Sequence, residues 1–418
     1  MNTKINFPKV ILFTTAGIII LLALSFAVLA IASRKPTAAF YGISERNQKN
    51  IEAVLQTTHT RRNKKSLPYN IVTLDSSVSL QKALKNVKKP TLLFINNGLN
   101  AEYAIKLAAK SRTGVNESVL SGMTNSVRRT AVVSAGAAKD KVLALPLLMD
   151  NYEIDISNVK FQPEVIEKVF TIDDLERVAK MSKSSTRAPI IFASADDEIF
   201  LNVFGAFVEA VSGREKFDSA VEKIRSSISV GKSSRAAFVS LLTELCANDG
   251  EFYETVQLFK KWEQMGIFPK NYLMFQQKDV NAYMISDNLN AVVIMSLSKH
   301  RSIERTVIAK YTSSFIPAST ARGDRNFTAP VIYGIMLKKD KVAKQSLELL
   351  AGDLQTQLCT KTGLAPVLAR CGVPDRQSDD VRYWVAATNV PLPAFSDAAF
   401  TNKPNRATFA EALRSILR

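Results

Sequence analysis

The sequence has few of the residues that metalloenzymes and hydrolases most often use. Two histidines, three cysteines and two tryptophans occur among its 418 residues. The cysteines (Cys246, Cys359 and Cys371) are too few for a disulfide scaffold, and no C-x-x-C pair occurs. A zinc site or a Ser-His-Asp arrangement would need His59 or His300, the only two imidazoles. These shortages argue against both classes of enzyme.

Sequence motifs of common enzymes are also missing. The patterns G-x-S-x-G, H-E-x-x-H and G-x-G-x-x-G do not occur. Gly231–Ser233 resembles the end of a phosphate-binding loop, but Ser226 stands where that motif requires its first glycine. The carboxylate pairs 196–197 and 379–380 are most simply solvated loop residues. We therefore expect no enzyme, no cofactor and no metal site, and an exported hydrolase is the weakest hypothesis.

Basic residues outnumber acidic ones, but their distribution does not indicate nucleic-acid binding. The chain has 55 Lys and Arg against 38 Asp and Glu, a formal net charge of +17. The charges are spread along the chain, with one dense cluster at 61–65. No zinc finger, aromatic-rich RNP-like strand or basic region joined to heptads is present. We expect no nucleic-acid partner; the cluster is a solvated face or, alternatively, attracts anionic lipid head groups.

One long apolar run lies at the N-terminus. The 24 residues between Lys9 and Arg34 carry no charge. As a helix they would cover about 36 Å, and the hydrocarbon core of a bilayer is about 30 Å thick. Residues 10–33 are therefore predicted to be a transmembrane signal anchor in the lipid bilayer, with residues 1–9 as a cytoplasmic tail.

A cleaved secretory signal is the alternative for this segment. Lys4 and Lys9 supply a positive n-region, and Ala30–Ala32 is an acceptable cleavage site. The apolar run is longer than the usual h-region of about 7–15 residues, which favours the anchor. In both cases the body is exported. With the anchor in place, we expect it on the periplasmic side of the cell inner membrane, attached by a single pass. In that compartment Cys359 and Cys371 could form a disulfide, or all three cysteines could stay thiols.

After residue 36 the chain has the composition of a globular protein. Hydrophobic residues make up 46% and charged residues 22% of the sequence. A body of this length exceeds what one core usually serves, so two domains are expected. No repeat of 20–50 residues is visible, which disfavours a solenoid.

Continuous hydrophobic runs alternate with helical spacing, a pattern typical of parallel strands covered on both faces. Strands are expected at 38–43, 69–74, 91–95, 142–149, 189–193, 291–295, 306–309 and 330–337. Helices are expected at 45–58, 80–87, 101–109, 171–181, 198–211, 215–227, 232–247, 253–265 and 343–358. Asn96 and Asn97 follow the third strand, where the ligand crevice of such a sheet lies. An ordinary Asn-Asn-Gly turn is the alternative for this pair.

Four stretches of the chain resemble, in their order, the extracellular solute-binding proteins of ABC importers, the group that includes maltose-binding protein. They are Ala144–Pro146 leading into Asp150–Tyr152; Phe238–Gly266 followed by Asp279–Met295; Thr328–Val367; and Pro391–Phe395 with the helix Phe409–Leu417. In that family they correspond to a crossing between lobes, a helix pair with the next strand, a return strand with its helix and a Gly-hydrophobic-x-Pro-Val turn, and the closing segment.

The resemblance implies an α/β, two-lobed periplasmic-binding-protein-like fold of type II. One lobe would hold residues 37–147 and 328–372, and the other residues 148–327 and 373–418. It also implies a small-molecule solute, of which a sugar is the family's usual example, held between the lobes and delivered to ABC permease subunits. The ligand-binding residues expected on this basis are Asn96, Asn97, Asp150, Tyr152, Asp196, Ser296, Tyr333 and Trp384.

Two departures from the family pattern leave an alternative open. The chain has no lipobox cysteine, and sugar-binding members usually present several aromatic faces. Of the two tryptophans, Trp262 is expected in the core, and Trp384, beside Tyr383, is the better candidate for the cleft. A tethered sensor or structural protein with a degenerate cleft is therefore the alternative to transport.

Overall fold

The computed structural model describes residues 35–60, 69–134, 141–183, 187–286, 290–319 and 325–418. The predicted tail and anchor (residues 1–33) and the basic cluster at 61–65 lie outside this part of the chain. Within it, none of the helices has the length and apolar character needed to cross a membrane.

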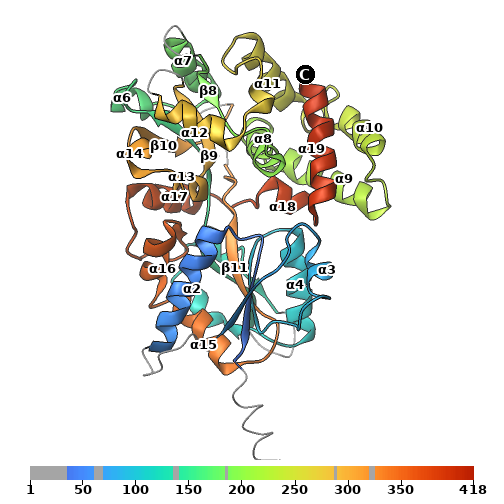
Figure 1. Cartoon of the computed structure of the whole chain (residues 1–418), viewed down its shortest axis with the longest axis vertical. Coiled ribbons are helices and arrows are strands. Elements are labelled where there is room, and N and C mark those ends of the chain that lie inside the picture. The colour runs from blue at the N-terminus through green and yellow to red at the C-terminus, as the bar shows by residue number, and fades with distance from the viewer. Residues whose placement is uncertain (1–34, 61–68, 135–140, 184–186, 287–289, 320–324) are drawn as a thin grey trace, which may run out of the picture.

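The described chain forms two lobes, each built around its own β-sheet (Figure 1). The first sheet contains β1 (Thr37–Tyr41), β2 (Asn70–Thr73), β3 (Leu92–Asn96), β4 (Val115–Asn116), β5 (Val132–Val133), β6 (Lys141–Met149), β11 (Val331–Met336) and β12 (Ala365–Pro366). Its main strand order is β12-β6-β11-β3-β1-β2, and β4 and β5 both pair with β6. The expected parallel pairing is found between β1 and both β2 and β3, whereas β11 is antiparallel to β3 and β6.

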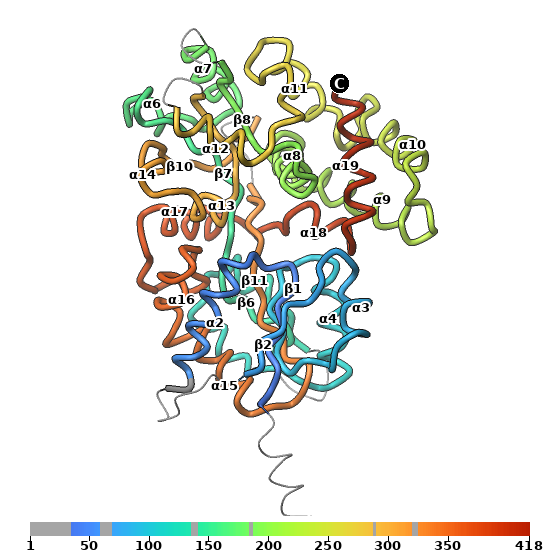
Figure 2. Tube along the Cα trace, viewed as in Figure 1, coloured from blue at the N-terminus to red at the C-terminus, as the bar shows by residue number. Residues whose placement is uncertain are grey.

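Helices from both ends of the chain pack around this first sheet. They are α2 (Glu45–Thr60), α3 (Leu80–Ala83), α4 (Leu99–Lys110), the 3₁₀ turn Glu117–Leu120, α5 (Asn125–Arg128), α15 (Lys341–Leu350), α16 (Gln355–Thr362) and α17 (Arg376–Ala386). In Figure 2 the orange α15 and α16, which come late in the sequence, lie beside the blue α2. The lobe therefore closes only when the chain returns to it after residue 330.

Strand β6 contains a proline, which the sheet accommodates by a local irregularity. Pro146 pairs with Tyr333 and Leu148 with Ile332, so Leu147 is the extra residue between two matched pairs. Proline has no N–H to donate, and bulges are where a sheet tolerates it. The strand continues through this point to Met149 with its side chains buried.

The second sheet has strand order β10-β7-β9-β8, and its strands are β7 (Tyr152–Ser157), β8 (Ile190–Ile191), β9 (Val292–Ser296) and β10 (Tyr311–Phe315). Strands β8 and β9 are parallel, and β7 is antiparallel to β9 and β10. The helical elements of this lobe are α6 (Pro163–Ile166), α7 (Ile172–Ser182), α8 (Asp197–Ser212), α9 (Arg214–Ser229), α10 (Arg235–Leu245), α11 (Tyr253–Gln264), the 3₁₀ turn Tyr272–Met274, α12 (Gln277–Ile285), α13 (Leu297–His300), α14 (Arg305–Ile308), α18 (Phe395–Ala399) and α19 (Lys403–Leu417).

Aromatic side chains fill the core of the second lobe. Phe259, on α11, is fully buried and lies within 5.2–5.6 Å of the rings of Phe204, Phe207 and Phe268. Trp262 is also fully buried and donates its indole N–H to Glu176, which confirms its expected place in the core. The expected cap at Thr171 is present as a reciprocal capping box with Asp174.

Three segments of the chain pass between the lobes. Residues 149–152 join β6 to β7, residues 327–331 lead back to β11, and residues 387–394 lead from α17 to α18. The first two are hydrogen-bonded to each other, from Asp150 N to Pro330 O at 2.8 Å and from Tyr152 N to Thr328 O at 3.0 Å. The third joins them through Ala329 N, which donates to Leu392 O at 3.1 Å.

The structure differs from the expected elements at several places, and β7, an inner strand of the second sheet, was not expected. The stretch expected as a strand at 306–309 is helix α14, and the strand follows it as β10. The single helix expected at 343–358 is divided into α15 and α16 by a turn at 351–354. The expected lobe boundary at residue 372 places α17 in the second lobe. In the structure Val381 and Val385 belong to the core around the first sheet, so α17 packs with the first lobe.

The aromatic core of the second lobe gives a stability prediction. Replacing Phe259 by Ala removes a fully buried ring and leaves a cavity, so the free energy of unfolding in urea should fall by about 3–5 kcal/mol. Phe170→Ala is the matched control, because 53% of Phe170 is exposed, and it should lower that free energy by less than about 1 kcal/mol. Equal losses in both variants would contradict the packing described here.

Candidate functional site

A cavity of about 270 Å³ lies between the lobes, beside the crossing segments. Both lobes and all three crossings contribute to its wall. Its polar lining residues are Ser44, Arg46, Asn47, Asn96, Asp150, Tyr152, Glu198, Asn202, Gln277, Ser296, Ser298, Lys299, Ser302 and Asp397. Its wall therefore combines carboxylates and amides with hydroxyl groups.

Asp150 enters the cavity wall at the first crossing. Its carboxylate Oδ1 accepts hydrogen bonds from the backbone N–H groups of Asn151 and Ser298, each at 2.9 Å. Burial raises the pKa of Asp150, while the bonds from Ser298, Asn151 and Ser296 lower it and leave a net upward shift. The side chain thus joins the crossing to the start of α13 and keeps a carboxyl group at the cavity.

Tyr152, two residues along, is held by an amide on α8. The Nδ2 atom of Asn202 donates to the Tyr152 hydroxyl at 2.7 Å, and the Oδ1 atom of Asn202 accepts from the backbone N–H of Ser396 at 2.8 Å. Burial raises the pKa of Tyr152 well above its ordinary value, so the phenol stays protonated. Tyr152 is the one aromatic ring among the described residues that line this cavity.

The lobes contact each other directly at Asn96 and Asp397. Asn96, at the end of β3, donates from Nδ2 to Asp397 Oδ2 at 3.3 Å and to Gly42 O at 3.4 Å. Gly98 lies against the same residue: its φ is +138°, and an added Cβ atom would come within 2.4 Å of the Asp397 carbonyl oxygen. Glycine is therefore needed here for both its backbone conformation and its lack of a side chain.

The surroundings of Asp397 disfavour its charged form. Burial and the nearby carboxylate of Glu198 raise the pKa of Asp397 to about 7, against the opposing effects of Arg406 and the Asn96 hydrogen bond. Glu198 itself pairs with Arg406 at 2.6 Å. Near neutral pH the Asp397 carboxyl group can therefore donate as well as accept a hydrogen bond.

Asn47 forms a second contact between the lobes at the cavity. Its Nδ2 atom, on α2, donates to the Ser298 hydroxyl on α13 at 3.0 Å. Asn47 is only 3% exposed, and its Oδ1 atom has no hydrogen-bond partner among the described residues. A buried acceptor without a partner is unfavourable by about 1–3 kcal/mol, so a donor entering the cavity would relieve it.

Four of the eight residues expected from the sequence line this cavity: Asn96, Asp150, Tyr152 and Ser296. The structure places the other four elsewhere. Asn97 turns inward, and its Oδ1 accepts from Val331 N at 2.9 Å. Asp196 caps α8 by accepting from the N–H groups of Glu198 and Ile199.

The two expected aromatic residues also lie outside the cavity. Tyr333 is buried in β11 and donates its hydroxyl to Thr130 O at 2.7 Å, and burial raises its pKa to about 12. Trp384, on α17, packs edge-on against Phe315 and lines a separate groove. The residues that carry polarity into the cavity but were not anticipated include Asn47, Glu198, Asn202, Lys299 and Asp397.

The wall as a whole offers many hydrogen-bonding groups to a small molecule. Its carboxylates and amides accept and donate hydrogen bonds, and the hydroxyl of Ser302 is already directed to Lys299 O. Among the described residues, no histidine and no cysteine lines this cavity. Such a wall can hold a small polar molecule by several convergent hydrogen bonds.

Comparison with known proteins identifies the architecture. No protein-family model matches the sequence, and no curated protein matches it either. Among solved structures, the bacterial solute receptor AcbH, reported with an exclusive preference for β-D-galactopyranose, is similar with a TM-score of 0.62 at 10% identity, covering 92% of this chain and 99% of that one. This chain has the two-lobed fold of the solute-binding proteins.

Other members of that fold are similar to a comparable degree. A chitin oligosaccharide binding protein has a TM-score of 0.57 at 12% identity and covers 92% of this chain and 100% of its own. The binding protein msmE of Bacillus subtilis, in an open conformation, has a TM-score of 0.60 at 11% identity, with 92% and 95% covered. The resemblance expected from the sequence is thus confirmed at the level of the fold.

The electrostatics of Asp397 give a prediction on pH dependence. Because its pKa is raised in the folded protein, the unfolded chain ionises first, and stability is lost as the pH rises from about 4 to 7. Asp397→Asn removes this loss, so the variant should exceed the native protein in free energy of unfolding by roughly 1–4 kcal/mol above pH 7 and by little near pH 4. Urea titrations across this range measure it.

Asp353→Asn, at an exposed carboxylate after α15, is the control. Its effect on the free energy of unfolding should stay within about 0.5 kcal/mol at every pH. A difference between the Asp397→Asn variant and the native protein that does not change with pH would contradict a raised pKa.

Proposed function

We propose that this chain is the solute-binding component of an ABC importer, which captures a small polar solute of the sugar or polyol class between its lobes. The observation that carries the proposal is the cavity walled by both lobes and lined with carboxylates, amides and hydroxyls. The sugar receptors that share the fold support it. The crossing segments supply the hinge about which such lobes close on a ligand.

The ligand contacts proposed are Asn96, Asp150, Tyr152 and Ser296, together with Asn47 and Asp397. Hydroxyl groups of a sugar can donate to the free Oδ1 of Asn47 and to the Asp397 carboxyl group while accepting from Asn96. The ring of Tyr152 offers an apolar face to the carbon skeleton. Because one ring is available where sugar-binding sites usually use several, hydrogen bonds carry most of the recognition.

The size of the cavity limits the solute. A volume of about 270 Å³ is just below the range of ligand pockets, which is about 300–1,000 Å³. A monosaccharide-sized ligand fits this class better than an oligosaccharide. The proposal therefore separates this chain from the chitin oligosaccharide binding protein that shares its fold.

The remaining parts of the proposal concern the membrane. Residues 10–33 would anchor the chain by a single pass, with residues 1–9 in the cytoplasm and the two lobes on the periplasmic side of the inner membrane. The closed lobes would deliver the solute to permease subunits in the same membrane. A tethered sensor without transport is the alternative; it is favoured by the internal pairing of Asn96 with Asp397 and of Glu198 with Arg406, which uses groups a ligand would need.

A thermal-shift screen tests solute capture. The full-length protein in detergent is heated with sugars, polyols, amino acids and polyamines. A monosaccharide or polyol present at 100 times its Kd should raise the free energy of unfolding by about 2.7 kcal/mol. Asn47→Ala should weaken that ligand at least about tenfold, because it removes an acceptor in the cavity.

Asn86→Ala is the matched control for that variant, since Asn86 is exposed and away from the cavity. It should leave the ligand's Kd unchanged. If none of the four classes of solute stabilises the native protein, capture is contradicted and the sensor alternative gains. If the ligand binds but no permease subunit co-purifies with the protein, transport is contradicted and capture stands.

The cysteines give a test of the compartment. The thiol of Cys359, on α16, is hydrogen-bonded to that of Cys371, and this bond lowers the pKa of Cys371 to about 6, whereas burial raises the pKa of Cys359. In an oxidising compartment a disulfide-exchange oxidant would take two electrons, and the two thiols would release two protons. We expect a Cys359–Cys371 disulfide in protein isolated from its own cells, detected by mass spectrometry after alkylation.

Cys246 is the internal control, because burial raises the pKa of its thiol to about 11 and it should be alkylated as a free thiol. Three free thiols in the native protein would contradict the expected Cys359–Cys371 disulfide. The mass of the intact alkylated protein, measured in the same experiment, also shows whether cleavage after Ala32 has removed the N-terminal segment.

A further inference from the structure

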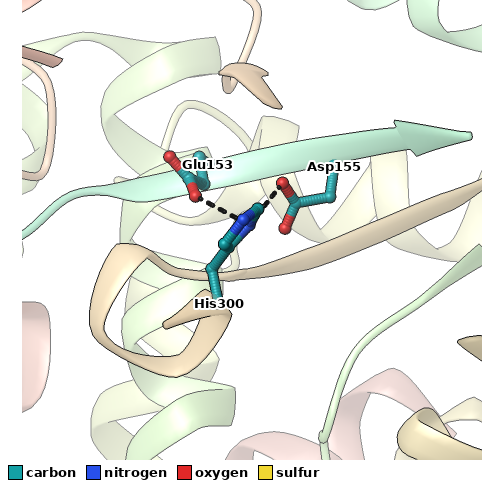
Figure 3. A group of neighbouring side chains, drawn as sticks. All are labelled: Glu153, Asp155 and His300. Carbon is teal, nitrogen blue, oxygen red and sulfur yellow. Dashed lines mark hydrogen bonds and ion pairs between the residues drawn. The ribbon is translucent and has the colours of Figure 1, made fainter. Parts of the chain in front are cut away.

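Glu153, Asp155 and His300 come together behind the cavity wall, although nearly 150 residues separate the acids from the histidine in sequence (Figure 3). Glu153 and Asp155 project from the same side of β7, and His300 at the end of α13 lies between them. The His300 Nδ1 atom is 3.0 Å from Asp155 Oδ1 and 3.6 Å from Glu153 Oε1. One atom of each side chain thus converges on a common point.

The three side chains are buried, and two of them are carboxylates that a positive charge would stabilise. Glu153 and Asp155 are 0% exposed and His300 is 6% exposed. Glu153 Oε2 and Asp155 Oδ2 have no hydrogen-bond partner among the described residues. Two carboxylates in one buried site need compensation by a proton, a charged partner or a cation, and a bound metal ion is one group that can supply it.

The spacing of the three converging atoms fits a metal ion. With zinc–nitrogen and zinc–oxygen bonds of about 2.0–2.1 Å in a tetrahedral arrangement, neighbouring ligand atoms lie about 3.3–3.4 Å apart. The observed separations of 3.0 and 3.6 Å from Nδ1 lie on either side of this value. Imidazole with two carboxylates is a ligand set that zinc accepts, and calcium or magnesium would require more oxygen atoms.

A second layer of polar contacts surrounds all three ligands. The Ser313 hydroxyl, on β10, donates to Asp155 Oδ1 at 2.5 Å. The Nε2 atom of Gln377, on α17, donates to Glu153 Oε1 at 2.5 Å, and it also lies 3.1 Å from His300 Nδ1 and 2.6 Å from the Ser313 hydroxyl oxygen. Hydrogen bonds of this kind fix the carboxylates that bind a metal and raise its affinity.

A path to the cluster is also present. A groove of about 540 Å³ runs along β10 and α17, and its wall includes His300, Ser313 and Gln377. Trp384 and Asp380 line the same groove. An ion could therefore reach the ligands from this side without passing through the solute cavity.

We propose that Glu153, Asp155 and His300 bind one divalent transition-metal ion, Zn²⁺ being the ion that fits best. The ion takes the place of the proton between the imidazole and the carboxylates. Because Gln377 belongs to the helix that packs with the first lobe, the site ties that lobe to β7 and α13 of the second. The sequence predicted no metal site, since its three ligands follow no known motif and meet only in the fold.

Metal binding can be measured on the full-length protein. The protein is stripped with a chelator and dialysed against Zn²⁺, and the metal retained per chain is determined by mass spectrometry. We expect one zinc per chain in the native protein and none in Asp155→Asn or His300→Gln. Gln377→Leu, which removes only an orienting contact, should weaken zinc binding by about 10–100-fold.

Glu167→Gln is the matched control, because Glu167 is an exposed carboxylate at the same groove outside the cluster, and it should retain one zinc. Zinc K-edge absorption of the native protein is independent of any variant. A shell of oxygen and nitrogen at about 2.0–2.1 Å supports the site, and sulfur at about 2.3 Å would assign the metal to cysteines and overturn it. Substoichiometric zinc in the native protein, or zinc unchanged in both ligand variants, would also overturn the proposal.

Discussion

The backbone hydrogen bonds between the crossing segments are the constraint on which the rest of the structure depends. Asp150 and Tyr152 donate to carbonyl groups of the returning segment at 328–330, and Ala329 donates to Leu392 of the third crossing. Three chain segments joined in this way fix the position at which the two lobes meet. The angle between the lobes is then the main motion that these bonds leave open. Small changes of φ and ψ near these bonds are what a hinge requires. The cavity forms beside these crossing segments because the facing walls of both lobes meet there.

Strand β7 begins at these crossing segments, and its alternation places the cavity and the Glu153–Asp155–His300 cluster on opposite sides. Tyr152, Ile154 and Ile156 face α8 and the apolar core, with Tyr152 at the cavity end. Glu153 and Asp155 point to the opposite side, where His300 lies. The side-chain period of two is visible in the sequence YEIDIS, but alternation usually indicates a strand with one face in water. Here the polar face is buried as well.

The sequence was sufficient for the elements that repeat a strong pattern and insufficient for the direction of single side chains. Continuous apolar runs predicted β3, β6, β9 and β11, and the Thr171 cap predicted the start of α7. Polarity after β3 was also visible, but only the fold shows that Asn96 faces the other lobe while Asn97 turns back to Val331. Asp397 was missed because its importance comes from Glu198, almost 200 residues away.

Under the proposed function, the pairing of polar groups across the cavity determines which solutes can bind between the lobes. Asn96 is bonded to Asp397 and Asn47 to Ser298, so a solute that enters between them must replace these bonds. An apolar solute would leave each separated group unpartnered, at about 1–3 kcal/mol apiece. A hydroxyl group can accept from the amide and donate to the carboxylate at once, so it restores both. Under the proposed function, the cavity therefore selects polyhydroxyl molecules through these hydrogen bonds, even with a single aromatic ring.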